Sequence, residues 1–231
     1  GTDLSGFSFN GFGTDAGASI TAADAGDEDN VITGSSGADS ITGGDGADTI
    51  NFTGGGRDAS VIGTATHSAT NDFDSISNFG LQSAAVGGTP DLSSVANFQG
   101  STDGGADADL LDFAAAGTLG GADTGVNVAS AAEGSGFTIT ADEAADGLLT
   151  LGGADSGEID TLDEWIDVAD TMAGTDGDVV AFQFDNNSYV FQQDSSNGDD
   201  LVELVGVDAE GISLATATTP AGATDNAFVL G

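Results

Sequence analysis

Three consecutive nine-residue segments align without a gap: AGDEDNVIT (25–33), GSSGADSIT (34–42) and GGDGADTIN (43–51). Each segment places one isoleucine in the same column: Ile32, Ile41 and Ile50. An asparagine or aspartate stands two residues before each isoleucine: Asn30, Asp39 and Asp48. A short repeat of fixed period is typical of solenoids, in which successive turns stack and face their large apolar residues inward. This stretch therefore predicts a coil of short parallel strands.

The glycines of the repeat allow tight turns between these strands, because glycine adopts positive φ at no steric cost. Each turn then offers backbone carbonyl oxygens and one carboxylate, and Ca²⁺ takes roughly six to eight oxygen ligands. We expect an ion between successive turns to draw ligands from both. The predicted calcium-site residues in the repeat are Asn30, Gly34, Gly37, Asp39, Gly43, Asp45, Gly46 and Asp48. The density of acids nearby adds four candidates: Asp27, Asp29, Asp72 and Asp74.

The charge of the chain also favours the binding of cations. Thirty-nine acidic residues face one basic residue, Arg57, and the formal net charge is −38. Most of the acids are aspartates grouped with glycine, whereas the acidic surface of a protein adapted to high salt would spread them over all elements. Without lysine and arginine clusters the chain has no means of binding nucleic acid or an anionic membrane surface. We therefore expect cations, or subunits bridged by cations, as partners.

Other kinds of site lack their usual residues. The chain has no cysteine, so disulfides and thiolate metal sites are excluded and oxygen-ligated ions remain. His67 is the sole histidine, with no HExxH motif around it and no GxSxG around any serine. We expect no enzymatic activity. No apolar run approaches the ~20 residues that span a bilayer, so we expect no membrane insertion.

The rest of the chain shows strands and one helix. Residues 52–72 break the nine-residue period, and 72–79 indicate an exit strand. Thr161 and Glu164 form a capping box for an amphipathic helix over 161–173. Three β-rich segments then predict a meander: 179–184, 189–193 and 201–207. The apolar end of the chain fits either a final strand or an exposed export signal.

These elements predict an all-β fold: a short parallel β-roll plus a β-sandwich or meander with one short amphipathic helix. We expect two domains. Residues 1–79 would hold the N-terminal strands and the calcium-binding roll. Residues 80–231 would form a β-rich domain with the helix and the C-terminal meander.

Residues 25–51 resemble the nonapeptide repeats of the RTX family, written G-G-x-G-x-D-x-U-x with U a large apolar residue. The C-terminal third is more loosely similar to the segment before the secretion signal of such proteins, including bacterial surface-layer proteins. The resemblance implies a β-roll that forms in calcium-rich surroundings after type I secretion, with Asp39 and Asp48 as the best carboxylate ligands. Asn30 departs from the pattern, and only two units match well, so we expect a short roll with few ions.

Three functions remain open at this point. The first is a calcium-dependent, self-assembling extracellular structural protein, such as a surface-layer or filament subunit, forming homo-oligomers or polymers with calcium at or near the interfaces. The second is an adhesive module that binds a cell-surface glycan, using aromatic residues such as Tyr189 or Trp165. The third is the export and calcium-folding region of an RTX enzyme. We expect the first, at a secreted or cell-surface location.

Overall fold

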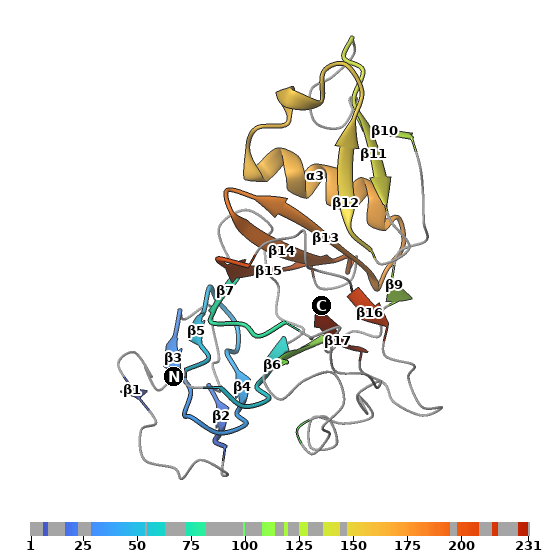
Figure 1. Ribbon diagram of the computed structural model, residues 1–231. Coiled ribbons are helices and arrows are strands. Elements are labelled where there is room, and N and C mark those ends of the chain that lie inside the picture. The colour runs from blue at the N-terminus through green and yellow to red at the C-terminus, as the bar shows by residue number, and fades with distance from the viewer. Residues whose placement is uncertain are drawn as a thin grey trace.

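The computed structural model describes the following residues: 7–8, 17–22, 29–53, 55–62, 73–81, 99, 108–113, 118–119, 125–128, 136–143, 147–194, 198–207, 214–216 and 226–230. They form three sheets and one α-helix (Figure 1).

The N-terminal part is a coil whose chain alternates between two parallel ladders of strands (Figure 1). One ladder contains β1 (Phe7–Ser8), β3 (Val31–Thr33), β5 (Thr49–Asn51) and β7 (Asp74–Ser77). The other contains β2 (Ser19–Thr21), β4 (Ser40–Thr42), β6 (Ala59–Ile62) and β8 (Leu110–Phe113). We call strands β1 to β8 the coil. The predicted stacking of the nine-residue segments is confirmed, because β3 pairs with β5 so that Ile32 lies opposite Ile50.

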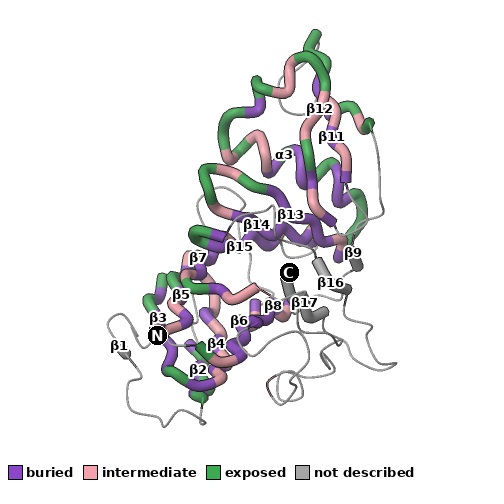
Figure 2. Tube along the Cα trace, in the orientation of Figure 1, coloured by how far each residue is buried: buried purple, intermediate pink, exposed green. Residues whose placement is uncertain are grey.

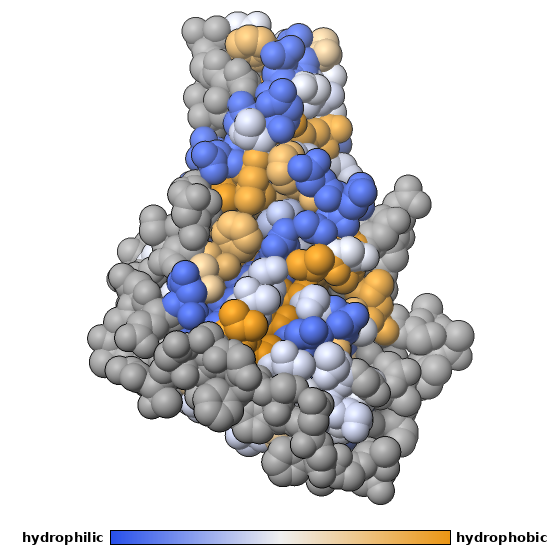
Figure 3. All heavy atoms as spheres, turned by 90° about the vertical axis from the view of Figure 1, so that its left-hand side faces the viewer, coloured by the Kyte–Doolittle hydropathy of each residue, from blue (hydrophilic) through white to orange (hydrophobic). Residues whose placement is uncertain are grey.

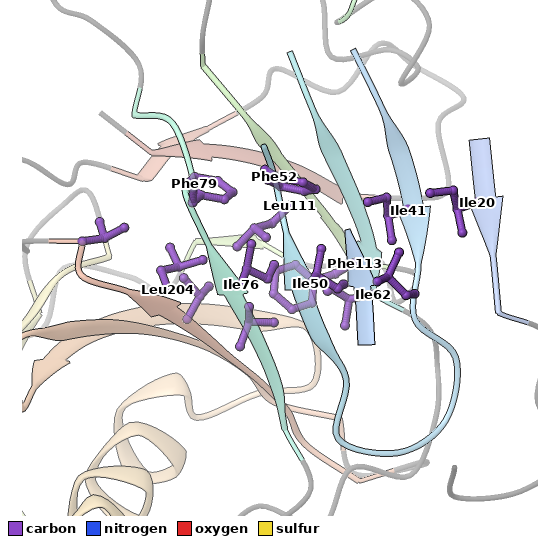
Figure 4. Close-up of a cluster of buried hydrophobic side chains, with 14 of the residues drawn as sticks. Ile20, Ile41, Ile50, Phe52, Ile62, Ile76, Phe79, Leu111, Phe113 and Leu204 are labelled. Atoms are coloured by element: carbon purple, nitrogen blue, oxygen red, sulfur yellow. The ribbon is translucent and has the colours of Figure 1, made fainter. Parts of the chain in front are cut away.

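The core of the coil lies between its two ladders. The middle residue of each three-residue strand is buried, and its two neighbours face away from the core. The buried side chains from both ladders point toward one another (Figure 4), and the labelled ones are Ile20, Ile41, Ile50, Phe52, Ile62, Ile76, Phe79, Leu111, Phe113 and Leu204. Figure 2 shows the same buried centre along both ladders. Since each strand is only three or four residues long, this shared core holds the ladders together.

The C-terminal strands extend both ladders. The meander of β13 (Asp178–Phe184), β14 (Asn187–Gln192) and β15 (Asp200–Val205) is antiparallel, and β15 pairs in parallel with β7. β9 (Thr118–Leu119) pairs with β13 at the far edge. The sheet of β2, β4, β6 and β8 continues from β8 to β17 (Asn226–Leu230) and β16 (Leu214–Thr216), both antiparallel. The end of the chain is therefore a strand of this sheet.

The helix α3 (Leu162–Ala173) packs on the other face of the meander. Thr161 caps it, and the predicted capping box with Glu164 is present. A third sheet shares this second core: β10 (Val126–Asn127), β11 (Thr140–Glu143) and β12 (Leu149–Gly152), followed by the short helix η1 (Ser156–Glu158). Trp165 of the helix stacks on Phe182, which stacks on Tyr189, both with ring centroids 5.3 Å apart. The predicted helix and the three predicted meander strands are confirmed.

The predicted fold class is wrong. The strands do not form an all-β arrangement of a short roll plus a distinct sandwich, because the meander and the terminal hairpin continue the sheets of the coil as mixed parallel and antiparallel sheets of eight and six strands. The helix packs in one core with two sheets, the meander and the sheet of β10, β11 and β12, rather than against a single sheet. The division of the chain at residue 79 stays a prediction. Among the residues that the structure describes, no helix is long and apolar enough to cross a membrane.

Candidate metal centre

A ladder of aspartates runs along the strand order β2, β4, β6 and β8. Each aspartate stands immediately before its strand, and its carboxylate accepts a hydrogen bond from the backbone N–H one turn earlier. The Oδ1 atom of Asp39 accepts from Ala18 at 2.5 Å, that of Asp58 from Asp39 at 2.7 Å, and that of Asp109 from Asp58 at 2.8 Å. We call Asp39, Asp58 and Asp109 the first ladder.

The opposite sheet carries the same arrangement. The Oδ1 atom of Asp48 accepts a hydrogen bond from the backbone N–H of Asn30 at 2.8 Å, and that of Asp74 accepts from Asp48 at 3.0 Å. We call Asp48 and Asp74 the second ladder. Asn30 occupies the equivalent place in the preceding turn, one residue before β3.

Both ladders are buried: none of the five aspartates is more than 3% exposed. A buried carboxylate is costly unless hydrogen bonds compensate for its lost hydration. Asp39 receives further hydrogen bonds from Ser35, whose backbone N–H lies 2.5 Å from Oδ2 and whose hydroxyl lies 2.7 Å from Oδ1. The Oδ2 atom of Asp109 accepts from the backbone N–H of Gly80 at 2.7 Å. Backbone amides therefore hold carboxylates in line along each sheet.

Two glycines of the repeat are required by close approach to these carboxylates. A Cβ atom on Gly43 would overlap the carboxylate of Asp48 in the same segment, and one on Gly34 would lie 2.5 Å from the Oδ2 atom of Asp39. Gly46 has a φ of 102°, the positive value expected of a turn glycine. Gly37 instead faces Gly56 of the next turn, where a side chain on Gly56 would meet the Gly37 backbone.

Successive aspartates of a ladder are one strand apart, roughly 4.8 Å. Like charges at this spacing repel, and burial strengthens the repulsion because the medium between them is less polar than water. At Asp58, loss of hydration acts first and this repulsion adds to it. Burial raises the pKa of its carboxyl to about 7; the hydrogen bond from the Asp39 backbone N–H lowers that pKa, and the charge of Asp39 raises it. Burial at this position therefore favours a proton on Asp58 or a cation beside it.

Two of the remaining predicted carboxylates, Asp29 and Asp45, lie in the described part of the chain and belong to neither ladder. Asp29 is exposed, and its Oδ1 atom accepts from the backbone N–H of Ala47 at 3.1 Å. Asp45 is half-buried in the turn before Asp48. Asp27 and Asp72 lie outside the described residues.

The donor chemistry of the ladders fits Ca²⁺, a hard cation that binds carboxylate and carbonyl oxygens. Within the described ranges, no group of three or more His, Cys, Asp or Glu side chains is arranged to hold a metal ion. An ion on a ladder would therefore take its other ligands from backbone carbonyl oxygens of the turns, as the sequence predicts for a repeat with one carboxylate per turn.

Sequence reasoning missed Asp58 as a member of the first ladder. Asp58 lies in the stretch predicted to break the period, yet β6 follows it and pairs with β4. Its signal was the tripeptide Gly56-Arg57-Asp58, which repeats the G-x-D of Gly37-Ala38-Asp39. The match was hidden because a buried serine, Ser60, lies opposite Ile41 where the repeat has isoleucine.

Comparison with known proteins found no significant match among family models, curated proteins or solved structures.

Proposed function

We propose that this chain is a calcium-dependent, non-enzymatic structural protein of the cell exterior that assembles with copies of itself. The observation that carries the proposal is the pair of buried aspartate ladders, which place five carboxylates in two lines inside a molecule of net charge −38. A ladder of this kind is stable when a cation offsets the repulsion between its members.

Calcium would lie along the ladders, where Asp39, Asp58 and Asp109 form one line and Asp48 and Asp74 the other. When bound, it would supply positive charge and additional coordination bonds between successive turns. The chain's own residues align the carboxylates through backbone amides and keep them from water. Because the three-residue strands have little stability alone, binding and folding would be coupled.

The same charge would make assembly depend on cations. Copies carrying −38 repel one another at a distance, and divalent cations both screen and bridge such surfaces. A protein exposed to millimolar calcium outside the cell would be folded and able to associate, whereas a chain in a low-calcium compartment would stay unfolded. This supports the extracellular location and the structural role together.

The test compares the purified chain in excess EGTA and in millimolar Ca²⁺ at low ionic strength. Circular dichroism should report a gain of β structure with Ca²⁺, and light scattering and electron microscopy should report ordered polymers that dissolve on chelation. Mg²⁺ at equal concentration controls for simple screening, because it is a poorer fit to carbonyl-rich sites. Full native structure in EGTA would overturn the calcium part, and a calcium-loaded chain that stays monomeric at high concentration would overturn the assembly part.

A further inference from the structure

The outer face of the eight-stranded sheet carries two rows of side chains in register across β3, β5, β7 and β15. The first row is Val31, Thr49, Ser75 and Glu203, and the second is Thr33, Asn51, Ser77 and Val205. We call these eight residues the outer face. Every one of them is exposed or half-buried. Figure 3 views the molecule from the side on which β3, β5 and β7 lie in Figure 1, and orange and pale residues gather there among blue ones.

The outer face is almost uncharged, in contrast to the chain as a whole. Glu203 is its single ionisable residue, and three donors hold its carboxylate. Asn187 Nδ2 donates to Oε1 at 2.7 Å, the Tyr189 hydroxyl donates to Oε1 at 2.9 Å, and the Ser75 hydroxyl donates to Oε2 at 2.9 Å. Three neutral donors therefore fix the position of this carboxylate without removing its charge, and the other side chains of the face are hydroxyls, an amide and two valines.

Exposed apolar side chains concentrate on the same face. Among the described residues, three large hydrophobic side chains are exposed, and two of them are Val31 at 47% and Val205 at 42%. They stand in adjacent rows on the two outermost of the four strands, β3 and β15. Three strand spacings separate those strands, roughly 14 Å.

We propose that the outer face docks a second copy of this chain, face to face about a two-fold axis. The occupant follows from charge. Two copies of a chain with net charge −38 can approach closely only where each presents few carboxylates, and the outer face carries one, Glu203. This inference deepens the proposed function, on which it rests, by naming one contact of the assembly.

The two-fold geometry makes the contact self-complementary. An axis lying between the two faces and passing between β5 and β7 can set Val31 of each copy against Val205 of the other, because the two valines lie on opposite sides of that axis. The hydroxyl and amide side chains would then meet at the centre. Thr49, which is exposed, lies close to that centre.

The contact is small. Four strands about 4.8 Å apart and three residues of about 3.3 Å each cover roughly 200 Å² per copy, well below the ~800 Å² per partner of a stable complex. We therefore expect weak association in solution, as suits a lattice or filament in which each subunit makes several contacts. The experiment has to trap the pair rather than rely on its lifetime.

Cysteine cross-linking traps it, because the chain contains no native cysteine. Chains carrying Val31→Cys are mixed with chains carrying Val205→Cys in Ca²⁺ under mild oxidation, and disulfide-linked dimers are counted on non-reducing gels. The mixed pair should cross-link at least 10-fold faster than either variant mixed with Thr150→Cys, an exposed position on β12 outside the outer face. Equal rates for the mixed pair and the control would overturn the proposal.

A charge variant provides the second measurement. Thr49→Glu introduces a carboxylate near the centre of the contact in both copies, and Thr150→Glu adds the same charge elsewhere. Sedimentation at increasing concentration in Ca²⁺ should show at least 10-fold weaker association for Thr49→Glu than for Thr150→Glu. Equal association would overturn the proposal, even if Ca²⁺ still induced folding in circular dichroism. Cross-linking that is specific but unaffected by EGTA would support the outer face while overturning the calcium dependence.

Discussion

The substitution Asp58→Asn tests the ladder most directly. In the calcium-free protein, burial raises the pKa of Asp58 from its usual 3.8 to about 7. The folded state therefore binds a proton that the unfolded state releases at any pH between these values. The stability that Asp58 contributes is fully present below about pH 3.8 and is lost as the pH rises to 7. At the higher pH the unfolded chain carries an ionised Asp58, so folding must either bury that charge or take up a proton from a solution in which protons are scarce.

The size of this effect follows from the two pKa values. The interval from 3.8 to about 7 is worth at most ~4 kcal/mol at ~1.36 kcal/mol per pH unit, and we expect about 2 kcal/mol once solvent screening and relaxation are included. Asparagine keeps an Oδ1 atom to accept the hydrogen bond from the Asp39 backbone N–H, but it carries no charge at any pH. The calcium-free variant should therefore be more stable than the wild type at pH 7.5 and indistinguishable from it near pH 4.

The assay is the fraction of folded chains in EGTA, followed by circular dichroism from pH 4 to pH 8. The wild type should lose structure as the pH rises, and Asp58→Asn should lose less, with a weaker response to added Ca²⁺ because one ladder carboxylate is gone. Many other carboxylates titrate in this chain, so the difference between variant and wild type is the informative quantity. Asp160→Asn, an exposed position before the helix, is the matched control. A constant offset between Asp58→Asn and wild type over the whole pH range would refute the reasoning.

Three further variants test the repeat and the helix. Asp39→Ala combined with Asp48→Ala should weaken calcium-induced folding in circular dichroism titrations. Each substitution leaves a buried backbone N–H without its acceptor, which costs about 1–3 kcal/mol of folding free energy. An unchanged titration would place the ions elsewhere. Gly43→Ala should lower the free energy of unfolding, measured by urea denaturation, by about 1–3 kcal/mol, because its Cβ atom overlaps the Asp48 carboxylate. A wild-type free energy of unfolding would contradict that packing. Thr161→Ala should cost about 1 kcal/mol in thermal unfolding through loss of the helix cap, with no change in the calcium titration.

Local patterns predicted the local structure well. The isoleucine columns identified the stacked turns of the coil, since a buried residue at the middle of each short strand needs no information from elsewhere in the chain. The capping box located the start of α3, and alternating apolar residues located the meander. Asp39 and Asp48 could be selected as ladder members because they share one column of the repeat.

Long-range pairing could not be predicted in this way. β6 and β8 pair although 51 residues separate Ala59 from its partner Leu110, and β7 pairs with β15 across more than half of the chain. No short motif encodes such partners, since they depend on which sheet edge remains open when the strand arrives. Asp58 was missed for a local reason, because Ser60 follows it where the repeat has isoleucine, although β6 pairs with β4.

The mixed sheets link the ladders to the C-terminal strands. Asp109, the last member of the first ladder, stands just before β8, and β8 is held on its other side by the final strand β17. Asp74, the last member of the second ladder, is the first residue of β7, which is held by β15. Each line of carboxylates thus ends on a strand that the C-terminal segment completes. Strands of three residues are too short to pair stably alone, so aligning the carboxylates depends on the meander and the terminal hairpin as well as on the repeat. Any cation that stabilises the ladders must for the same reason stabilise the pairing of the C-terminal strands, although no ladder residue lies in them.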